Sequence, residues 1–139
     1  MFDLRSVTPQ AERFIREAGL EDRVTVHAGD FFTDPLPPAD LYALGRIVHD
    51  WSEEKVRGLL DKIHAALPPG GGVLIAERLL YPFKDGPLNA NLQSLNMLVV
   101  TEGKERTAAE YEALLRQSGF GQVQARTTGR PLDAVLAIK

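Results

Sequence analysis

The sequence predicts an α/β fold in which helices pack on a mainly parallel β-sheet that ends in an antiparallel hairpin. Two observations carry this prediction. Segments with helical periodicity alternate with short runs of β-branched and other apolar residues along most of the chain. Near the C-terminus, two such runs, 123–128 and 132–138, are separated only by Gly129-Arg130-Pro131, which is short enough for a hairpin.

The first third of the chain predicts one helix and three strand segments. Residues 2–4 have the pattern of a strand end, and residues 24–28 alternate as a half-buried strand does. Between them, Thr8 is a candidate N-cap of a helix that stops at Gly19. The apolar run 41–47 predicts a buried strand.

The middle of the chain predicts a helix, a strand and a second helix. Ser52 is expected to cap a helix that ends at the turn 68–72, and a short buried strand follows at 73–76. The next helix opens at Pro87 and runs to about residue 100. It carries an apolar stripe that predicts core packing (Leu88, Leu92, Leu95 and Val99) and a more polar stripe suited to solvent or a ligand (Asn89, Gln93, Asn96 and Val100). Thr107 and Glu110 then form a capping box for a helix over 108–118.

Composition and charge exclude several classes of protein. The 139 residues suit one domain, and a net charge of -3 is too small to indicate a nucleic-acid or membrane-surface partner. The absence of cysteine excludes disulfides and thiolate metal sites, and the three histidines lack metal-ligand spacing, so no metal is expected. There is no apolar run of ~20 residues to cross a membrane and no signal-peptide pattern, so a cytoplasmic location is expected.

His49 and Asp50 follow the apolar run 41–48 and precede the helix predicted at Ser52. This position is the carboxyl end of a strand, where open α/β sheets bind ligands. An imidazole titrates near neutral pH and suits proton transfer. A hydrogen-bonded structural histidine is the alternative interpretation.

Acidic residues end the neighbouring strands. Asp30 follows the strand before that of His49, Glu77 follows the strand after it, and Glu105 precedes the capping box. The carboxyl ends of parallel strands meet at one edge of a sheet, so these side chains could converge. A histidine flanked by two carboxylates suits a general base, because a carboxylate fixes the tautomer and stabilises the imidazolium. The alternative is that the two glutamates are surface groups or pair with neighbouring arginines.

Nucleotide-binding signals are sparse. Gly70-Gly71-Gly72 lies between a helix and a strand, the wrong order for a dinucleotide fingerprint, and is better explained as a turn. This counts against a dehydrogenase. Asp3, at a strand exit, could accept hydrogen bonds from a ribose.

In their order along the chain, these motifs resemble the class I S-adenosylmethionine-dependent O-methyltransferases of the acetylserotonin and plant phenolic type. The resemblance spans the whole chain. It is carried by Phe-Asp-Leu at 2–4, Gly-Asp-Phe-Phe at 29–32, Asp-Pro-Leu-Pro at 34–37, Arg-Ile-Val-His-Asp-Trp at 46–51, Pro-Gly-Gly-Gly at 69–72, Glu77, Ser-Leu-Asn-Met-Leu at 94–98 and Thr-Glu-Gly-Lys-Glu-Arg-Thr at 101–107.

The resemblance implies roles for individual residues. His49 would deprotonate the acceptor hydroxyl, with Glu77 and Glu105 orienting it. The residues that would bind S-adenosylmethionine are Asp3 at the ribose, Gly29, Asp30 and Phe31 at the adenine, and Arg46 at the polar end. The residues that would line the pocket of a small hydroxylated aromatic acceptor are Asp50, Asn96 and Met97. Position 100, often polar in the acetylserotonin branch, is Val100 here, which leaves the acceptor open.

Family members carry an N-terminal helical dimerisation domain and a first strand with a glycine-rich loop before the Phe-Asp-Leu motif. The resemblance therefore implies that residues 1–139 are the C-terminal portion of a methyltransferase catalytic domain. We expect the strand at 24–28 to lose its neighbours, while those at 41–47, 73–76 and the C-terminal pair form a four-stranded sheet. Its open edge predicts rearrangement, a homo-oligomer, or association with a separate N-terminal part. The alternative function is a non-catalytic remnant that acts as a binding module.

Overall fold

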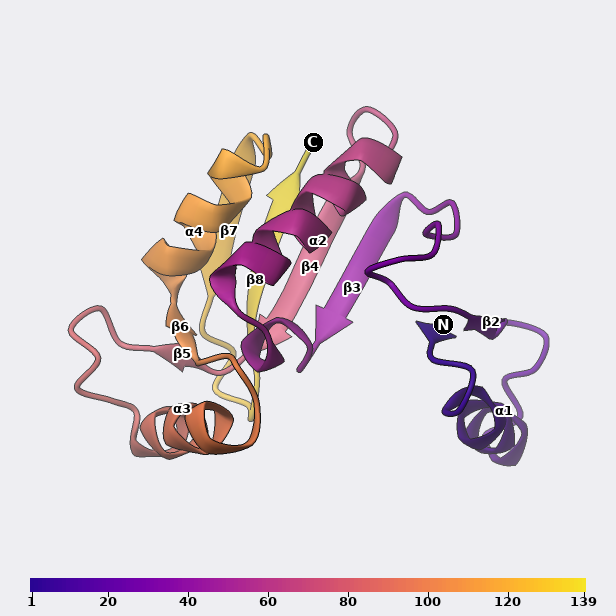
Figure 1. The fold of residues 1–139 in the computed structure, drawn as a ribbon, viewed down its shortest axis with the longest axis horizontal. Coiled ribbons are helices and arrows are strands. Elements are labelled where there is room, and N and C mark those ends of the chain that lie inside the picture. The colour runs from indigo at the N-terminus through magenta and orange to yellow at the C-terminus, as the bar shows by residue number, and fades with distance from the viewer. The chain divides into compact units, whose positions relative to one another are not determined.

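The computed structural model describes residues 1–139, which form two compact units, 1–38 and 39–139 (Figure 1). The first unit contains β1 (Phe2–Asp3), α1 (Thr8–Glu17) and β2 (His27–Ala28). β1 and β2 pair in parallel, with Asp3 opposite Ala28. The expectation that the strand at 24–28 loses its neighbours is therefore wrong for its last two residues, which pair with β1.

The start of α1 differs by one residue from the prediction. Val7 is the N-cap and Thr8 is the first helical residue. The Thr8 hydroxyl donates to the carbonyl of Arg5 at 3.1 Å instead of accepting from a helix amide. Pro9 still lies in the first turn, where its missing N–H costs no helix hydrogen bond.

The second unit is built on a four-stranded sheet with the order β3-β4-β8-β7. These strands are β3 (Leu41–Gly45), β4 (Gly72–Glu77), β7 (Gln122–Arg126) and β8 (Asp133–Ile138). β3 and β4 are parallel, whereas β8 is antiparallel to both β4 and β7. A further two-stranded parallel sheet joins β5 (Leu79–Leu80) to β6 (Arg106–Thr107). The contiguous four-stranded sheet and the α/β class with a C-terminal hairpin are confirmed.

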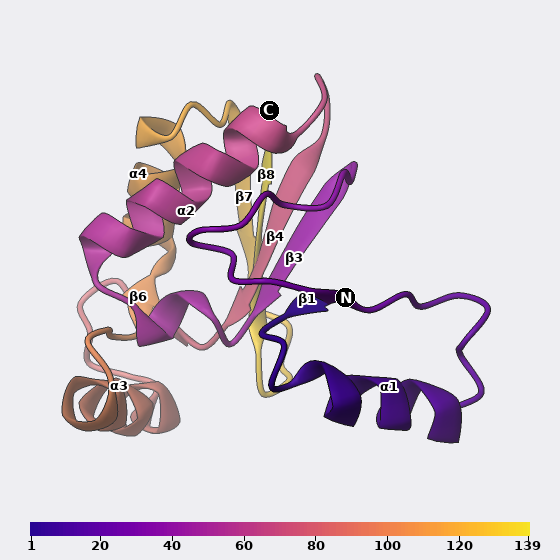
Figure 2. The ribbon, with the colours of Figure 1, turned by 45° about the vertical axis from the view of Figure 1, so that its right-hand side comes forward.

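Two helices, α2 (Glu53–Ala66) and α4 (Ala108–Gln117), cover one face of this sheet (Figures 1 and 2). The apolar stripe predicted for α2 is confirmed as core, together with residues of α4 and of alternate strand positions. The buried residues are Val56, Leu59, Leu60, Ile63, Leu67, Val73, Ile75, Tyr111, Leu114, Leu115, Val135 and Ala137. The capping box of α4 is present, since Thr107 and Glu110 exchange side-chain-to-backbone hydrogen bonds of 3.2 and 2.8 Å.

The predicted buried strand 41–47 ends earlier and is more exposed than expected. β3 ends at Gly45, and its residues alternate between exposed and half-buried; it is one of the two edge strands of the four-stranded sheet. Leu41 is 51% exposed.

The apolar stripe of α3 (Leu88–Val100) is not core, contrary to the prediction. The fully buried positions of this helix are Ala90 and Met97, which lie on the side that packs against β5 and the 3₁₀ helix η1 (Val48–Asp50). The remaining apolar side chains are 58–83% exposed and form what we call the α3 outer face, made of Leu88, Leu92, Leu95, Leu98, Val99 and Val100. No element of the second unit covers this face. None of the helices has both the length and the apolar character that a membrane span requires.

Candidate active site

His49 lies on a sharp turn at the carboxyl end of β3. Arg46, the first residue after the strand, has a left-handed φ of 55° and donates its N–H to the carbonyl of Ala76 at 3.1 Å. Such a conformation is uncommon in residues other than glycine and is concentrated at functional sites. The chain then enters η1, whose middle residue is His49. The turn thus directs the imidazole to the strand end, in agreement with the predicted position.

Glu77, at the end of the adjacent strand β4, holds this turn in place. Its Oε1 accepts hydrogen bonds from the backbone N–H groups of Ile47 and Val48, at 2.9 and 3.0 Å. Its Oε2 lies 3.5 Å from Nδ1 of His49 and has no hydrogen-bond partner. The carboxylate therefore both fixes the backbone of the turn and faces the imidazole.

Glu105 approaches the same ring nitrogen from the loop between α3 and β6. Its Oε1 lies 2.8 Å from Nδ1 of His49, and both side chains are buried. A carboxylate accepts, so Nδ1 carries the proton and Nε2 is left as the acceptor in the neutral ring. Nε2 lies 3.6 Å from Oδ1 of Asp50, whose side chain is 37% exposed.

Burial and neighbouring charges shift the pKa values of His49 and Glu77. Burial lowers the pKa of His49. The hydrogen bond to Glu105 and the charges of Glu77, Glu105 and Asp50 raise this pKa by more than burial lowers it, so the net pKa lies above 6.5. Burial raises the pKa of Glu77 to about 7; His49 and the two backbone amides oppose the rise, and Glu105 adds to it. The pKa values of His49 and Glu77 therefore both lie above their ordinary values.

Arg106 is a buried arginine for which the sequence indicates no role beyond that of a possible partner of Glu105. Its guanidinium donates to the carbonyls of Val48, Lys104 and Trp51, at 3.1, 3.3 and 3.2 Å. It therefore ties η1 to the loop that carries Glu105. No local signal points to this role, because it depends on contacts between segments about 55 residues apart.

Gly103 allows the loop to approach η1 closely. A Cβ at this position would lie only 2.6 Å from the carbonyl carbon of Asp50 and from the backbone nitrogen of Trp51. Real Cβ atoms do not come that close to backbone. Gly103 belongs to the motif at 101–107, but nothing in the sequence around it indicates this role.

The residues predicted on α3 divide between two environments. Met97 is buried on the side that packs against η1, and Ser94 accepts a 3.2 Å hydrogen bond from the backbone N–H of Glu105. The side chain of Asn96 is exposed and makes no hydrogen bond. The structure thus brings Asp50, Glu77 and Glu105 to His49, but shows no contact between Asn96 and this cluster.

The predicted cofactor residues of the first unit lie together at the ends of its two paired strands. The N–H of Gly29 donates to the carbonyl of Asp3 at 2.9 Å. One carboxylate oxygen of Asp3 accepts from its neighbour's N–H, and one of Asp30 accepts from the N–H two residues later, each at 2.8 Å. The other oxygen of each carboxylate is unengaged. Phe31 packs edge-on against the next phenylalanine, with ring centroids 4.6 Å apart. Arg46, the remaining predicted cofactor residue, belongs to the second unit.

The cluster of His49, Glu77 and Glu105 also has a geometry that could hold a metal ion. One ligand atom from each residue lies within 4.8 Å of the others. Nδ1 of His49 and Oε1 of Glu77 are, however, already committed to hydrogen bonds within the protein. These hydrogen bonds would have to break before the three residues could bind a metal ion.

Comparison with known proteins agrees with this geometry. Residues 1–121 match the O-methyltransferase domain family. The chain is 51% identical over 140 residues to acetylserotonin O-methyltransferase of Gallus gallus and 50% identical over 139 residues to that of Bos taurus. Each alignment covers the whole chain, which spans about 40% of the length of these relatives.

Two solved structures show the same arrangement of elements. Human N-acetylserotonin methyltransferase, in complex with SAM, has a TM-score of 0.93 at 46% identity over 99% of this chain and 39% of its own. An O-methyltransferase family 2 protein of Planctomyces limnophilus, in complex with apigenin, has a TM-score of 0.93 at 33% identity over 99% of this chain and 42% of its own. The chain therefore belongs to the O-methyltransferase domain family.

Proposed function

We propose that the chain takes part in methyl transfer from S-adenosylmethionine to a hydroxyl group, with His49 as the general base. The observation that carries this proposal is the buried contact between Nδ1 of His49 and Glu105, which leaves Nε2 to accept a proton. Relatives with 50–51% sequence identity are named as O-methyltransferases, which supports the reaction class.

The chemistry requires a base because the acceptor is a weak acid. A phenol has a pKa near 10, so little phenolate exists at neutral pH. S-adenosylmethionine supplies an electrophilic methyl group. Nε2 of His49 would take the hydroxyl proton as the oxygen begins to react, a contribution of typically ~10²–10⁴-fold. Glu105 and Glu77 would stabilise the resulting imidazolium. Because the pKa of His49 is raised, methyl transfer should increase as the pH rises through that pKa.

The residues predicted for the cofactor fit such a ligand. Asp3 and Asp30 lie at the carboxyl ends of parallel strands, and each keeps one carboxylate oxygen unengaged. Such oxygens suit the hydroxyls of a ribose and the polar edge of an adenine. We assign Gly29 and Phe31 to the adenine as well, and Arg46 to the polar end of the cofactor.

The acceptor we propose is a small hydroxylated aromatic molecule. Asp50, on the more open side of the imidazole, and the buried Met97 would contact it, with Asn96 as a further candidate. Relatives named for acetylserotonin support this class. We do not assign acetylserotonin itself, because position 100, often polar in the acetylserotonin branch, is Val100 here.

We further propose that residues 1–139 act as the C-terminal portion of a catalytic domain that associates with a second copy or a separate N-terminal part. The α3 outer face and the open edge of β3 support this proposal. A non-catalytic binding module is the second candidate. The cytoplasmic location stays a prediction.

Calorimetry with S-adenosylmethionine separates the two candidates. Binding at micromolar concentration supports the enzyme, and no binding at millimolar concentration supports the module. Methylation of a phenol panel should be lost in His49→Ala with cofactor affinity retained. His27→Ala, an exposed histidine outside the predicted site, is the matched control. Methyl transfer by His49→Ala at the rate of the unmodified chain would reject the base assignment.

A further inference from the structure

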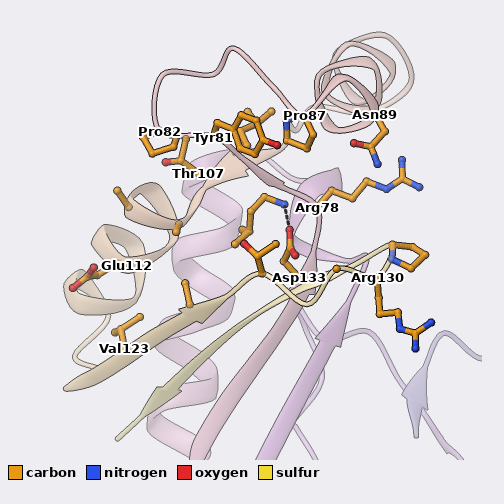
Figure 3. A pocket seen from close by; sticks show the side chains of 18 residues that line it. Arg78, Tyr81, Pro82, Pro87, Asn89, Thr107, Glu112, Val123, Arg130 and Asp133 are labelled. Carbon is orange, nitrogen blue, oxygen red and sulfur yellow. Dashed lines mark hydrogen bonds between the residues drawn. The ribbon is translucent and has the colours of Figure 1, made fainter.

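A pocket in the 39–139 unit lies apart from the His49 cluster. It encloses about 590 Å³, and none of His49, Glu77 or Glu105 lines it. Its walls come from β5 and the loop after it, the first turn of α4, β7 and the β7–β8 connection (Figure 3). Most of the lining is apolar and includes Tyr81, Pro82, Pro87, Ala109, Val123 and Ala125. The volume lies in the range of small-molecule sites.

The acidic groups of this pocket are already engaged. Oδ2 of Asp133 accepts from the N–H of Leu79 at 3.3 Å, the dashed line in Figure 3, and Oδ1 accepts from the N–H of Thr128 at 3.0 Å. Glu112 is bound to Arg116 at 2.8 Å. These carboxylates are therefore committed within the protein.

The basic groups of the pocket are not engaged. The side chains of Arg78 and Arg130 make no hydrogen bond and no ion pair in the structure, and Nε of Arg78 is buried without a partner. In the view of Figure 3, both guanidinium groups extend on the same side of the pocket. No existing contact of these groups would have to break for an anion to bind. An anion that accepts from Arg78 would also satisfy a donor that is otherwise left unpaired.

We propose that this pocket binds an organic anion with an aromatic body and a carboxylate or phosphate group. The apolar walls suit the aromatic body, and a guanidinium matches either oxyanion through paired N–H donors. The pocket is separate from the proposed methyl-transfer site, so this inference does not depend on His49 acting as a base.

Titration of the ¹⁵N-labelled chain with 1-naphthyl phosphate tests the proposal by NMR. Saturable shifts should centre on pocket residues such as Leu79, Ala109 and Val123, with submillimolar affinity. The neutral 1-naphthol lacks the anion, and inorganic phosphate lacks the aromatic body, so each should bind at least tenfold more weakly. Shifts centred on the His49 turn, or equal binding of the three compounds, would overturn the assignment.

Variants that remove single arginine charges provide a second test of the proposal. Arg78→Gln and Arg130→Gln should each weaken binding of the phosphate about tenfold. Arg126→Gln removes the same charge from β7 at a position that does not line the pocket, and should change nothing. Arg130 is exposed, so its variant remains folded even if Arg78→Gln disturbs packing. If Arg126→Gln weakens binding as much as Arg130→Gln does, the attraction is nonspecific and the proposal is wrong.

Discussion

Nδ1 of His49 lies 2.8 Å from Oε1 of Glu105, and the two side chains are 3% and 0% exposed. A hydrogen bond this short between buried groups couples the protonation of the ring to the charge of the carboxylate. The same contact fixes the tautomer, so the properties of His49 depend on a residue 56 positions away in the sequence.

Glu105→Gln should lower the pKa of His49, because it removes the charged acceptor at Nδ1 that helps to raise this pKa. NMR titration of the imidazole measures this directly, since the chain has only three histidines. Asp50→Asn is the matched control: its carboxylate lies 3.6 Å from Nε2 and is partly exposed, so it should lower the pKa less. An unchanged pKa in Glu105→Gln would contradict the assigned hydrogen bond.

The free energy of unfolding should fall as the pH rises, because Glu77 binds its proton more tightly in the folded chain. Its pKa is about 7 when folded against 4.5 as the ordinary value, so between these pH values the native state holds more protons. The fall should reach ~3 kcal/mol near pH 7. His49, whose folded pKa is also raised, contributes stability below pH 6.5 that is lost as the pH rises through its folded pKa.

Urea unfolding followed by fluorescence of Trp51, the one tryptophan, measures this dependence. Glu77→Gln should remove the fall in the free energy of unfolding between pH 4.5 and 7. The pH dependence that is due to His49 should remain. Glu54→Gln changes an exposed position on α2 whose side chain makes no hydrogen bond or ion pair, and it should leave the slope intact. A slope of the same size in Glu77→Gln would assign the effect to other groups.

Gly103→Ala should destabilise the chain by ~1–3 kcal/mol, because its Cβ would overlap the backbone of η1 and force the turn to move. Gly58→Ala offers a matched control, since a Cβ at this exposed position of α2 meets nothing within 4 Å and should stabilise the helix by up to about 1 kcal/mol. The midpoints of urea unfolding report both effects. Equal stability of the two variants would mean that the loop does not need a glycine.

Local patterns predicted the elements whose signals are contained within one segment. The stripe of α2 and the capping box of α4 depend on residues three or four positions apart, and both are present. The rule that parallel strands end at one edge also placed Glu77 near His49. The roles of Arg106 and Gly103 could not be predicted, because each depends on how the loop before β6 meets a turn more than 50 residues earlier.

The apolar stripe of α3 shows a different limit of the sequence. An apolar stripe at helical spacing indicates that one face of a helix packs against another element. It does not indicate which element that is. Leu88, Leu92, Leu95 and Val99 therefore predicted burial, whereas in the structure they belong to the α3 outer face and are 58–83% exposed. No element of the 39–139 unit covers this stripe, so the periodicity alone does not decide whether it is buried.

We expect the α3 outer face to drive self-association, because contiguous exposed apolar surface marks an interaction site. Sedimentation velocity should show dimers or larger species whose fraction rises with concentration. The double variant Leu92→Glu with Leu95→Glu should shift the chain to the monomer, since burying two carboxylates in an apolar interface is costly. The control adds the same two charges at exposed sites of α4, Ala113→Glu with Gln117→Glu, and should leave the association unchanged. A chain that is monomeric at every concentration, or one that the α4 variant dissociates equally well, would show that this face does not mediate association.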